Sequence, residues 1–325
     1  MIRNRRRLFA WSSLALAFAL TVAHLILGFR AGTIGEEGGD TVYAIALVFL
    51  TVAFAGTGVV ILSRQPRNPI GWLLIGITLM ANLALFMGDY ATYGLVTRPG
   101  VLPGARVAAW IDRWDIVPTL SLFIPLFLLF PDGAVPSPRW RPALWLGLAG
   151  PAITMLGFAL TPGRMTGSFA DLSQAHVVNP FGLSAFAGLV DAVTVGGGLA
   201  TLLAAFLAGA SLVFRFRSRR GDEREQVKWL AFVGAAFLAQ FIVNGVLATI
   251  LGETRASDAV GNALFGVMFF TLVLGIPLAC GVAILKYRLY DIDVVINKTV
   301  VYGLLAGFIT AVYVAIVVGI GALIG

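Results

Sequence analysis

The sequence predicts an all-α, polytopic integral membrane protein with about nine transmembrane helices and a cytoplasmic N-terminus. Three observations predict this fold. The composition is 59% hydrophobic and only 12% charged, whereas a soluble domain carries about 25% charged residues. Apolar stretches long enough to cross a bilayer recur along the whole chain. The basic residues concentrate in every second connecting segment.

Nine apolar stretches qualify as membrane spans, and short segments rich in Arg, Pro, Gly and Asp separate them. A spanning helix needs about 20 predominantly apolar residues. The predicted spans are 8–29, 42–62, 70–87, 116–130, 143–160, 186–214, 229–251, 259–285 and 299–324. No stretch alternates like a β-strand and no connecting segment is long enough for a soluble domain. The chain 1–325 is therefore predicted to be a single membrane domain.

The distribution of Lys and Arg predicts the orientation of the bundle, because cytoplasmic loops carry an excess of positive charge. With the N-terminus inside, few of the 23 basic residues fall in outer segments, namely Arg30, Arg98, Arg106, Arg113, Arg164 and Arg255. Acidic residues show the opposite bias. The net charge of +7 is therefore a topology signal, and the predicted partner is the lipid bilayer. Nucleic acid is not predicted, because the basic residues are scattered over several segments.

Two of the spans need separate justification. The stretch 116–130 is short and contains Pro118 and Pro125, but omitting it would move the basic cluster 215–228 to the outside. It is therefore retained, and the amphipathic stretch 105–114 before it is predicted to lie along the outer interface. The first span is predicted to be an uncleaved anchor, because its apolar run exceeds the 7–15 residues of a signal-peptide core.

Five polar residues are intramembrane candidates: His24, Asp89, Asp191, Gln240 and Asn244. An ionisable residue inside a span is a functional candidate by default. For the histidine, a satisfied packing role is the favoured interpretation. For the two aspartates, solvated helix ends are favoured over a ligand-facing vestibule. The amide pair, one helical turn apart, is expected to hydrogen-bond between helices or to line a small cavity.

No motif for catalysis or metal binding is present. The sequence contains no HExxH, GxGxxG, P-loop or GxSxG pattern. His24 and His176 have no further ligand type at metal spacing. Cys280 is the single cysteine and permits no internal disulfide. No catalytic residue, cofactor or metal ion is therefore predicted.

The most distinctive segment is 284–303, which reads ILKYRLYDIDVVINKTVVYG. Leu289, Ile292 and Ile296 share one helical face, which favours a short amphipathic interfacial helix over 286–298 rather than a plain inner loop. This junction would connect the last two spans on the cytoplasmic side. Its candidate signalling residues are Tyr287, Arg288, Tyr290, Asp291, Asp293 and Asn297.

Two further loops have recognisable sequences, NPIGW at 68–72 and FPDG at 130–133 followed by RWR at 139–141. Together with the YRLYDID…INKT…VYG junction, they resemble the membrane region of multi-span sensor histidine kinases of two-component systems. That family is common in actinobacteria and other high-GC bacteria. The resemblance covers most of the chain from Arg64 onwards. It implies a signal-input module in the bacterial cytoplasmic membrane, a homodimer, and cytosolic kinase domains or a response regulator as partners.

The chain departs from that family in its output. In the predicted topology neither His24 nor His176 can face a cytosolic ATP site, and no glycine-rich ATP lid is present. Kinase activity is therefore carried over to no residue. Nine spans place Gly325 outside, so the chain is expected to be the truncated sensing part of a longer system. The alternatives are a small-molecule transporter or channel, for which no internal repeat is evident, and an accessory membrane assembly protein.

Overall fold

The computed structural model describes residues 2–34, 40–170, 172, 175–218, 220, 222–251, 267, 271 and 274–284. Contacts divide the chain into two units, Met1–Lys286 and Tyr287–Gly325, and every described residue belongs to the first. Within the described residues the fold is helical, with an isolated antiparallel bridge between Arg164 and Val178 as its only β-type pairing. The prediction of an all-α fold is confirmed for this part of the chain.

The first half of the chain forms α1 (Ile2–Ala31), α2 (Asp40–Thr51), the π-helical turn η1 (Val52–Gly56), α3 (Thr57–Arg64), α4 (Pro69–Thr92), the π-helical turn η2 (Tyr93–Thr97) and α5 (Ala105–Asp112). The second half forms α6 (Ile116–Ser121), α7 (Phe123–Leu129), the 3₁₀ turn η3 (Pro138–Trp140), α8 (Arg141–Leu160), the 3₁₀ turn η4 (Ser184–Phe186), α9 (Ala187–Ser218) and α10 (Asp222–Leu251).

Among the described residues, five helices are long and apolar enough to cross a membrane: Leu8–Ala31, Ile45–Arg64, Pro69–Thr97, Pro138–Leu160 and Ser184–Ser218. They correspond to five of the predicted spans. Helix α10 covers the predicted span 229–251. The span 259–285 is described only in part, where 274–284 is helical, and both the junction 286–298 and the span 299–324 lie outside the described residues.

The predicted span 116–130 is not one continuous helix. It is broken at Leu122 into α6 and α7. Pro125 has no N–H to donate to the carbonyl of Ser121, and its ring crowds that carbonyl, so the helical hydrogen bonding is interrupted there. The predicted span 116–130 thus consists of two short helices in succession. The stretch predicted as interfacial does form a separate short helix, α5.

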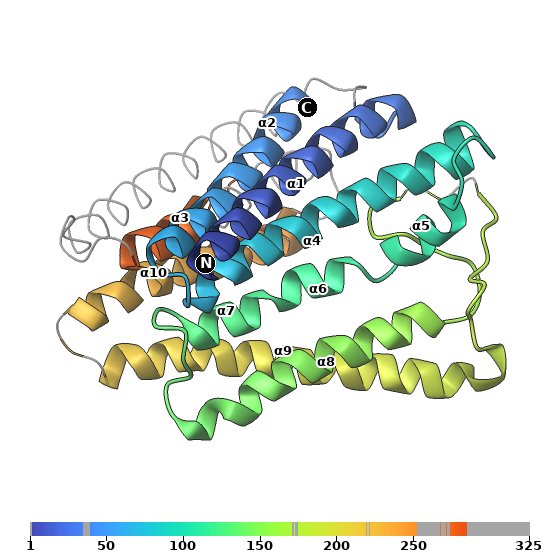
Figure 1. The fold of residues 1–325 in the computed structure, drawn as a ribbon. Coiled ribbons are helices and arrows are strands. Elements are labelled where there is room, and N and C mark those ends of the chain that lie inside the picture. Colours follow the sequence, from blue (N-terminus) through green and yellow to red (C-terminus); the bar gives the residue numbers. More distant parts are fainter. Residues whose placement is uncertain are drawn as a thin grey trace, which may run out of the picture. The chain divides into compact units, whose positions relative to one another are not determined.

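The broken helix occupies the space between two groups of long helices (Figure 1). Helix α4 contacts α1, α3, α6 and α7, while α6 contacts α8 and α7 contacts α9. Helices α8 and α9 form an extensively packed hairpin. Their backbones approach closely at glycines, because a Cβ added to Gly197 would lie 2.7 Å from the Thr154 nitrogen. Small residues are the usual means by which membrane helices pack tightly.

The two ends of the bundle take their names from residues that lie there. At the Asn68 end, where α4 begins, the largest buried cluster joins α3, α4, α7, α9 and α10 to the helical segment 274–284. At the Thr33 end, where α1 finishes, the Thr97 Oγ1 donates to the Ala31 carbonyl at 3.0 Å. A second buried cluster lies there, formed by α4, α5 and the segment 165–177.

Candidate functional site

Helices α1 and α4 share a buried histidine–aspartate pair near the Thr33 end. The Nδ1 of His24 lies 2.6 Å from the Oδ2 of Asp89. The two residues are only 3% and 5% exposed. Imidazole Nδ1–H donates to a carboxylate in the neutral tautomer as well as in the charged ring. The expectation that Asp89 is a solvated helix end is therefore wrong, because this carboxylate is buried against the ring of His24.

The second oxygen of this carboxylate connects the pair to the surface. The Thr33 Oγ1, which follows the end of α1, donates to the Asp89 Oδ1 at 2.8 Å. The Gly28 carbonyl accepts from the Thr33 backbone nitrogen at 3.1 Å. A side chain at Gly28 would be crowded, because an added Cβ would lie 2.5 Å from the Ile34 Cδ1 and 3.0 Å from the Asp89 Oδ2. Glycine thus allows α1 to approach the aspartate.

Deeper in the bundle, α1, α2 and α4 share a second set of hydrogen bonds. The Asn82 Nδ2 on α4 donates to the Thr51 Oγ1 at 3.1 Å and to the Ala17 carbonyl at 3.3 Å. The hydroxyls of Thr21 and Thr51 are 2.9 Å apart. The Asn82 Oδ1 is buried without a hydrogen-bond partner among the described residues. We call Thr21, His24, Thr51, Asn82 and Asp89 the polar seam.

The polar seam borders an irregular stretch of helix. Thr51 directly precedes the π-helical turn η1. Single π-turns inside α-helices occur frequently at functional sites, because they rearrange the local hydrogen bonding. The seam therefore joins three helices by polar contacts in a region that is otherwise apolar.

Two more buried carboxylates lie at the Thr33 end. The Asp112 carboxylate, at the end of α5, accepts hydrogen bonds from the backbone nitrogens of Phe169 and Ala170, at 3.1 and 3.0 Å. It thereby fixes the loop that follows α8. Asp115 is 4% exposed, and neither of its carboxylate oxygens has a hydrogen-bond partner among the described residues.

Burial changes the acidity of both groups. Burial raises the pKa of Asp115 to about 8, and the negative charge of Asp112 contributes to that rise. Burial also raises the pKa of Asp112, although the amides of Ala170 and Phe169 oppose that change by stabilising the carboxylate. A neutral carboxylic acid at Asp115 removes the cost of an unpaired buried charge.

At the Asn68 end, the loops with the NPIGW and FPDG sequences contact each other. Asn68 caps α4, with its Oδ1 accepting from the Ile70 nitrogen at 3.0 Å. Its Nδ2 donates to the Pro131 carbonyl of the FPDG loop at 3.3 Å. Gly133, with φ +79°, turns the chain so closely over Pro69 that an added Cβ would lie 2.8 Å from the proline Cγ.

A buried arginine on α9 fixes the FPDG loop from the other side. Arg215 is 1% exposed and donates to the Asp132 Oδ1 at 3.2 Å. It also donates to the Leu128 carbonyl at 2.9 Å and to the Ala134 carbonyl. A planar guanidinium presents several donors in fixed directions, which suits a loop with several carbonyls.

The same two loops reach the helix that leads towards the predicted junction. The Gln65 Oε1 accepts from the Asn68 Nδ2 at 3.0 Å. The Gln65 Nε2 donates to the Ile284 carbonyl at 3.2 Å, at the end of the helical segment 274–284. Gln65, Asn68, Asp132, Arg215 and Ile284 are named the loop hub. Segments far apart in the sequence are therefore linked at this end by side-chain hydrogen bonds.

The remaining predicted site residues are not brought together. Asp191 is exposed near the beginning of α9. The Gln240 Nε2 donates to the Thr271 Oγ1 at 3.0 Å, in agreement with the expected bond between helices. The side chain of Asn244 lies outside the described part, as do the junction candidates Tyr287, Arg288, Tyr290, Asp291, Asp293 and Asn297.

Several residues of these sites do not stand out in the sequence. In the sequence, Arg215 is only one of the positive charges used to assign the membrane orientation. No local signal distinguishes it from the basic residues that follow it. Asp112 and Asp115 likewise contribute only as charges. Asn82 does carry a signal that could have identified it, because an amide in the middle of an apolar span indicates a polar contact.

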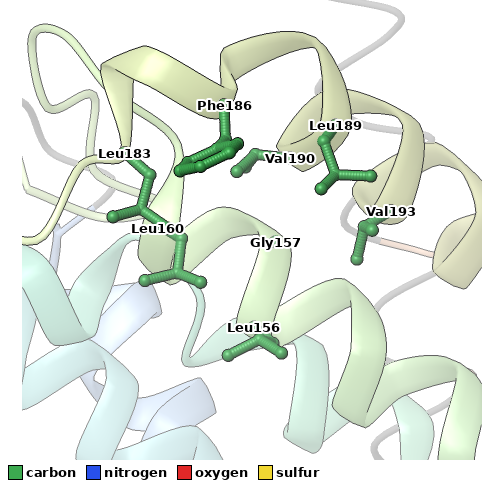
Figure 2. A pocket seen from close by; sticks show the side chains of 8 residues that line it. All are labelled: Leu156, Gly157, Leu160, Leu183, Phe186, Leu189, Val190 and Val193. Carbon is green, nitrogen blue, oxygen red and sulfur yellow. The ribbon is translucent and has the colours of Figure 1, made fainter.

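An apolar groove lies between α8 and α9 at the Thr33 end (Figure 2). It has a volume of about 290 Å³. Leu156 and Leu160 of α8 face Phe186, Leu189 and Val193 across it. The lining offers hydrocarbon contact but no polar group to orient a substrate. It therefore suits an apolar lipid chain rather than a substrate that must be oriented for a reaction.

Within the described residues, no three His, Cys, Asp or Glu side chains gather closely enough to hold a metal ion. The two sites found are the polar seam, which contains the buried His24–Asp89 pair, and the loop hub at the Asn68 end. No protein-family model matches the chain, and neither does any curated protein or solved structure.

Proposed function

We propose that this chain is a membrane-embedded signal-input module, similar in kind to the sensor part of a two-component histidine kinase. It would lie in the bacterial cytoplasmic membrane as a multi-pass protein with its N-terminus inside. In that orientation the Thr33 end faces the outside and the Asn68 end faces the cytoplasm. The kinase domains or response regulator that receive the signal would lie outside residues 1–325.

The observation that carries the proposal is the hydrogen bond from Gln65 to the Ile284 carbonyl. It ties the loop hub to the helix that immediately precedes the predicted junction 286–298. The polar seam involves the same helix, α4, through Asn82 in its middle and Asp89 near its finish, whereas Asn68 caps its beginning. A shift of α4 would therefore act on both networks. Two discrete arrangements of such packed helices can transmit a signal.

The proposal is tested by changing the polar seam and measuring the junction. A Cys280→Ala background with Asp293→Cys provides one reactive thiol in the junction. In purified protein, Asp89→Asn is expected to change the rate of maleimide labelling at position 293. Adding Gln65→Ala should remove that change, because the link to Ile284 is lost. Equal labelling rates with and without Asp89→Asn, in folded protein, would contradict the proposal.

The matched control is Asp191→Asn, an equivalent change at an exposed aspartate near the Thr33 end. It should leave labelling at position 293 unchanged. The proposed orientation has its own test, a cysteine introduced at Gly221. Labelling of this cysteine in intact cells by an impermeant reagent would overturn the assignment of the two ends.

A transporter is the second candidate, and the buried His24–Asp89 pair is the observation that favours it. Ionisable pairs inside membrane helices often belong to proton or ion pathways. A pH-sensitive dye inside proteoliposomes distinguishes the two functions. Proton or substrate flux that disappears in Asp89→Asn would favour transport, whereas tight vesicles together with a responsive junction would favour the sensor.

A further inference from the structure

A hollow of about 700 Å³ lies at the Thr33 end, between the turn 94–106 and the segment 175–180. Pockets of about 300–1,000 Å³ are typical of small-molecule sites. Its lining is mixed in character. Leu95, Leu102 and Val177 supply apolar surface, while Arg106 and His176 supply polar groups.

Among the described residues that line the hollow, Arg106 carries a permanent charge, and it is positive. Arg106 lies in the first turn of α5, and the positive end of the short helix dipole is added to its guanidinium charge. His176 supplies a second hydrogen-bond donor from the facing segment. No Asp or Glu is found among the described residues that line the hollow. A group that fits both side chains carries negative charge.

The walls of the hollow are held by contacts that do not involve a ligand. The Tyr90 hydroxyl donates to the Pro103 carbonyl at 2.8 Å, which fixes the turn before α5. The Asn179 Nδ2 donates to the Ala159 and Thr161 carbonyls at 2.9 and 2.8 Å, which fixes the facing segment. Gly100 and Gly104 adopt positive φ values of 84° and 73°, where a side chain would be strained. A pre-formed site binds without the cost of ordering its walls.

We propose that this hollow binds an amphipathic organic anion, with its acidic head group on Arg106 and His176 and its apolar body against Leu95, Leu102 and Val177. Binding itself follows from the hollow and its charges. That the bound anion is also the stimulus of the sensor rests on the proposed function. The same chemistry is found in a free fatty acid and in the head group and upper chain of an anionic lipid.

The test uses the whole chain in phosphatidylcholine nanodiscs, titrated with sodium decanoate by calorimetry. Saturable binding is expected for the wild-type chain. Arg106→Gln should weaken it about tenfold, the effect of losing one charge-assisted hydrogen bond. His176→Gln should weaken it less. Decanamide has the same apolar chain without the charge. Its affinity for the wild-type chain should be no higher than the affinity of decanoate for Arg106→Gln.

Two arginine variants serve as controls. Arg164→Gln removes an exposed charge near the hollow that is not part of its lining, and binding should be unchanged. Arg98→Gln changes a smaller neighbouring hollow of about 380 Å³, lined by Arg30, Tyr93 and Arg98. If Arg98→Gln weakens binding and Arg106→Gln does not, the proposal is wrong. Equal affinity in all variants would mean partition into the bilayer and would also overturn it.

Nanodiscs that contain phosphatidylglycerol separate the two sources of the anion. If the anionic lipid occupies the hollow, decanoate binds more weakly to the wild-type chain in these discs, and Arg106→Gln removes the difference. If its affinity is unchanged, the hollow selects a free anion. The binding test measures no signal output, so it is independent of the labelling test at position 293. A negative result in either test therefore does not change the interpretation of the other.

Discussion

The Nδ1 of His24 and the Oδ2 of Asp89 are 2.6 Å apart in a buried contact between α1 and α4. Helix α1 contains no acidic residue that could pair with His24, and α4 contains no basic residue that could pair with Asp89. The contact therefore links the first helix to the centre of the bundle. Its contribution to the free energy of unfolding is measured by removing one partner.

Replacing Asp89 with Ala should lower the free energy of unfolding by about 1–3 kcal/mol, because the buried imidazole of His24 loses its polar partner. Asp89→Asn retains an acceptor and should cost less. Unfolding by dodecyl sulfate in mixed micelles measures both. A double-mutant cycle with His24→Ala isolates the pair, and a coupling near zero would show that the contact has no energetic role. Asp191→Ala, at an exposed site, should change stability by less than about 0.5 kcal/mol.

Replacing Arg215 with Met should release the FPDG loop, because the carbonyls of Leu128 and Ala134 and the carboxylate of Asp132 lose their common donor. Loss of a buried donor costs about 1–3 kcal/mol. Hydrogen exchange should therefore accelerate at least about tenfold at the amide of Gly133, which donates to the Leu129 carbonyl at 2.7 Å. Arg217→Met removes an exposed charge on the same helix and is the matched control. Equal exchange in both variants would contradict the role assigned to Arg215.

The contact between α8 and α9 gives a prediction with four glycines. Alanine at Gly157 or Gly197 should destabilise the hairpin, because the new Cβ would overlap Thr194 or approach the Thr154 nitrogen to 2.7 Å. Overpacking of this kind costs about 1–3 kcal/mol. Alanine at Gly196 or Gly198 meets no atom within 4 Å, so stability should stay equal or rise by up to about 1 kcal/mol. Thermal unfolding in detergent compares all four, and a loss at Gly196 as large as at Gly197 would exclude close packing as the cause.

The buried carboxylate of Asp115 makes stability depend on pH. Its pKa is raised from an ordinary value of 3.8 to about 8, so the folded state retains a proton that the unfolded state releases. This contribution is fully present below about pH 4 and is progressively lost as the pH rises towards 8. Asp115→Asn is neutral at every pH. It should therefore gain stability over the wild-type chain as the pH rises.

The measurement is the difference in melting temperature between Asp115→Asn and the wild-type chain from pH 5 to pH 9, in one detergent. The difference should grow up to about pH 8 and then level off. Burial also raises the pKa of Asp112 and lowers that of Arg113, and both remain in the variant, so the comparison removes most of their contribution. A difference that does not change with pH would contradict a neutral Asp115.

Much of the fold follows from local sequence. Five helices of spanning length coincide with predicted spans, because an apolar run of that length has one stable arrangement in a bilayer. The Asn-Pro at 68–69 coincides with the start of α4, since the amide caps the helix and the proline fits its first turn. The break between α6 and α7 is only hinted at by Pro118 and Pro125. Length and hydropathy do not say where a proline-containing stretch breaks.

The sites depend on contacts between distant segments. The sequence by itself identified His24 as an unusual residue in the first span and Asp89 as one near the outer end of the third, and it identified the NPIGW and FPDG loops as distinctive. Only the tertiary structure paired the first two and joined the loops through Asn68, Gln65 and Arg215. The physical reason is that hydropathy fixes how far a helix extends, but not its rotation about its axis. That rotation decides which polar group meets which across a buried interface.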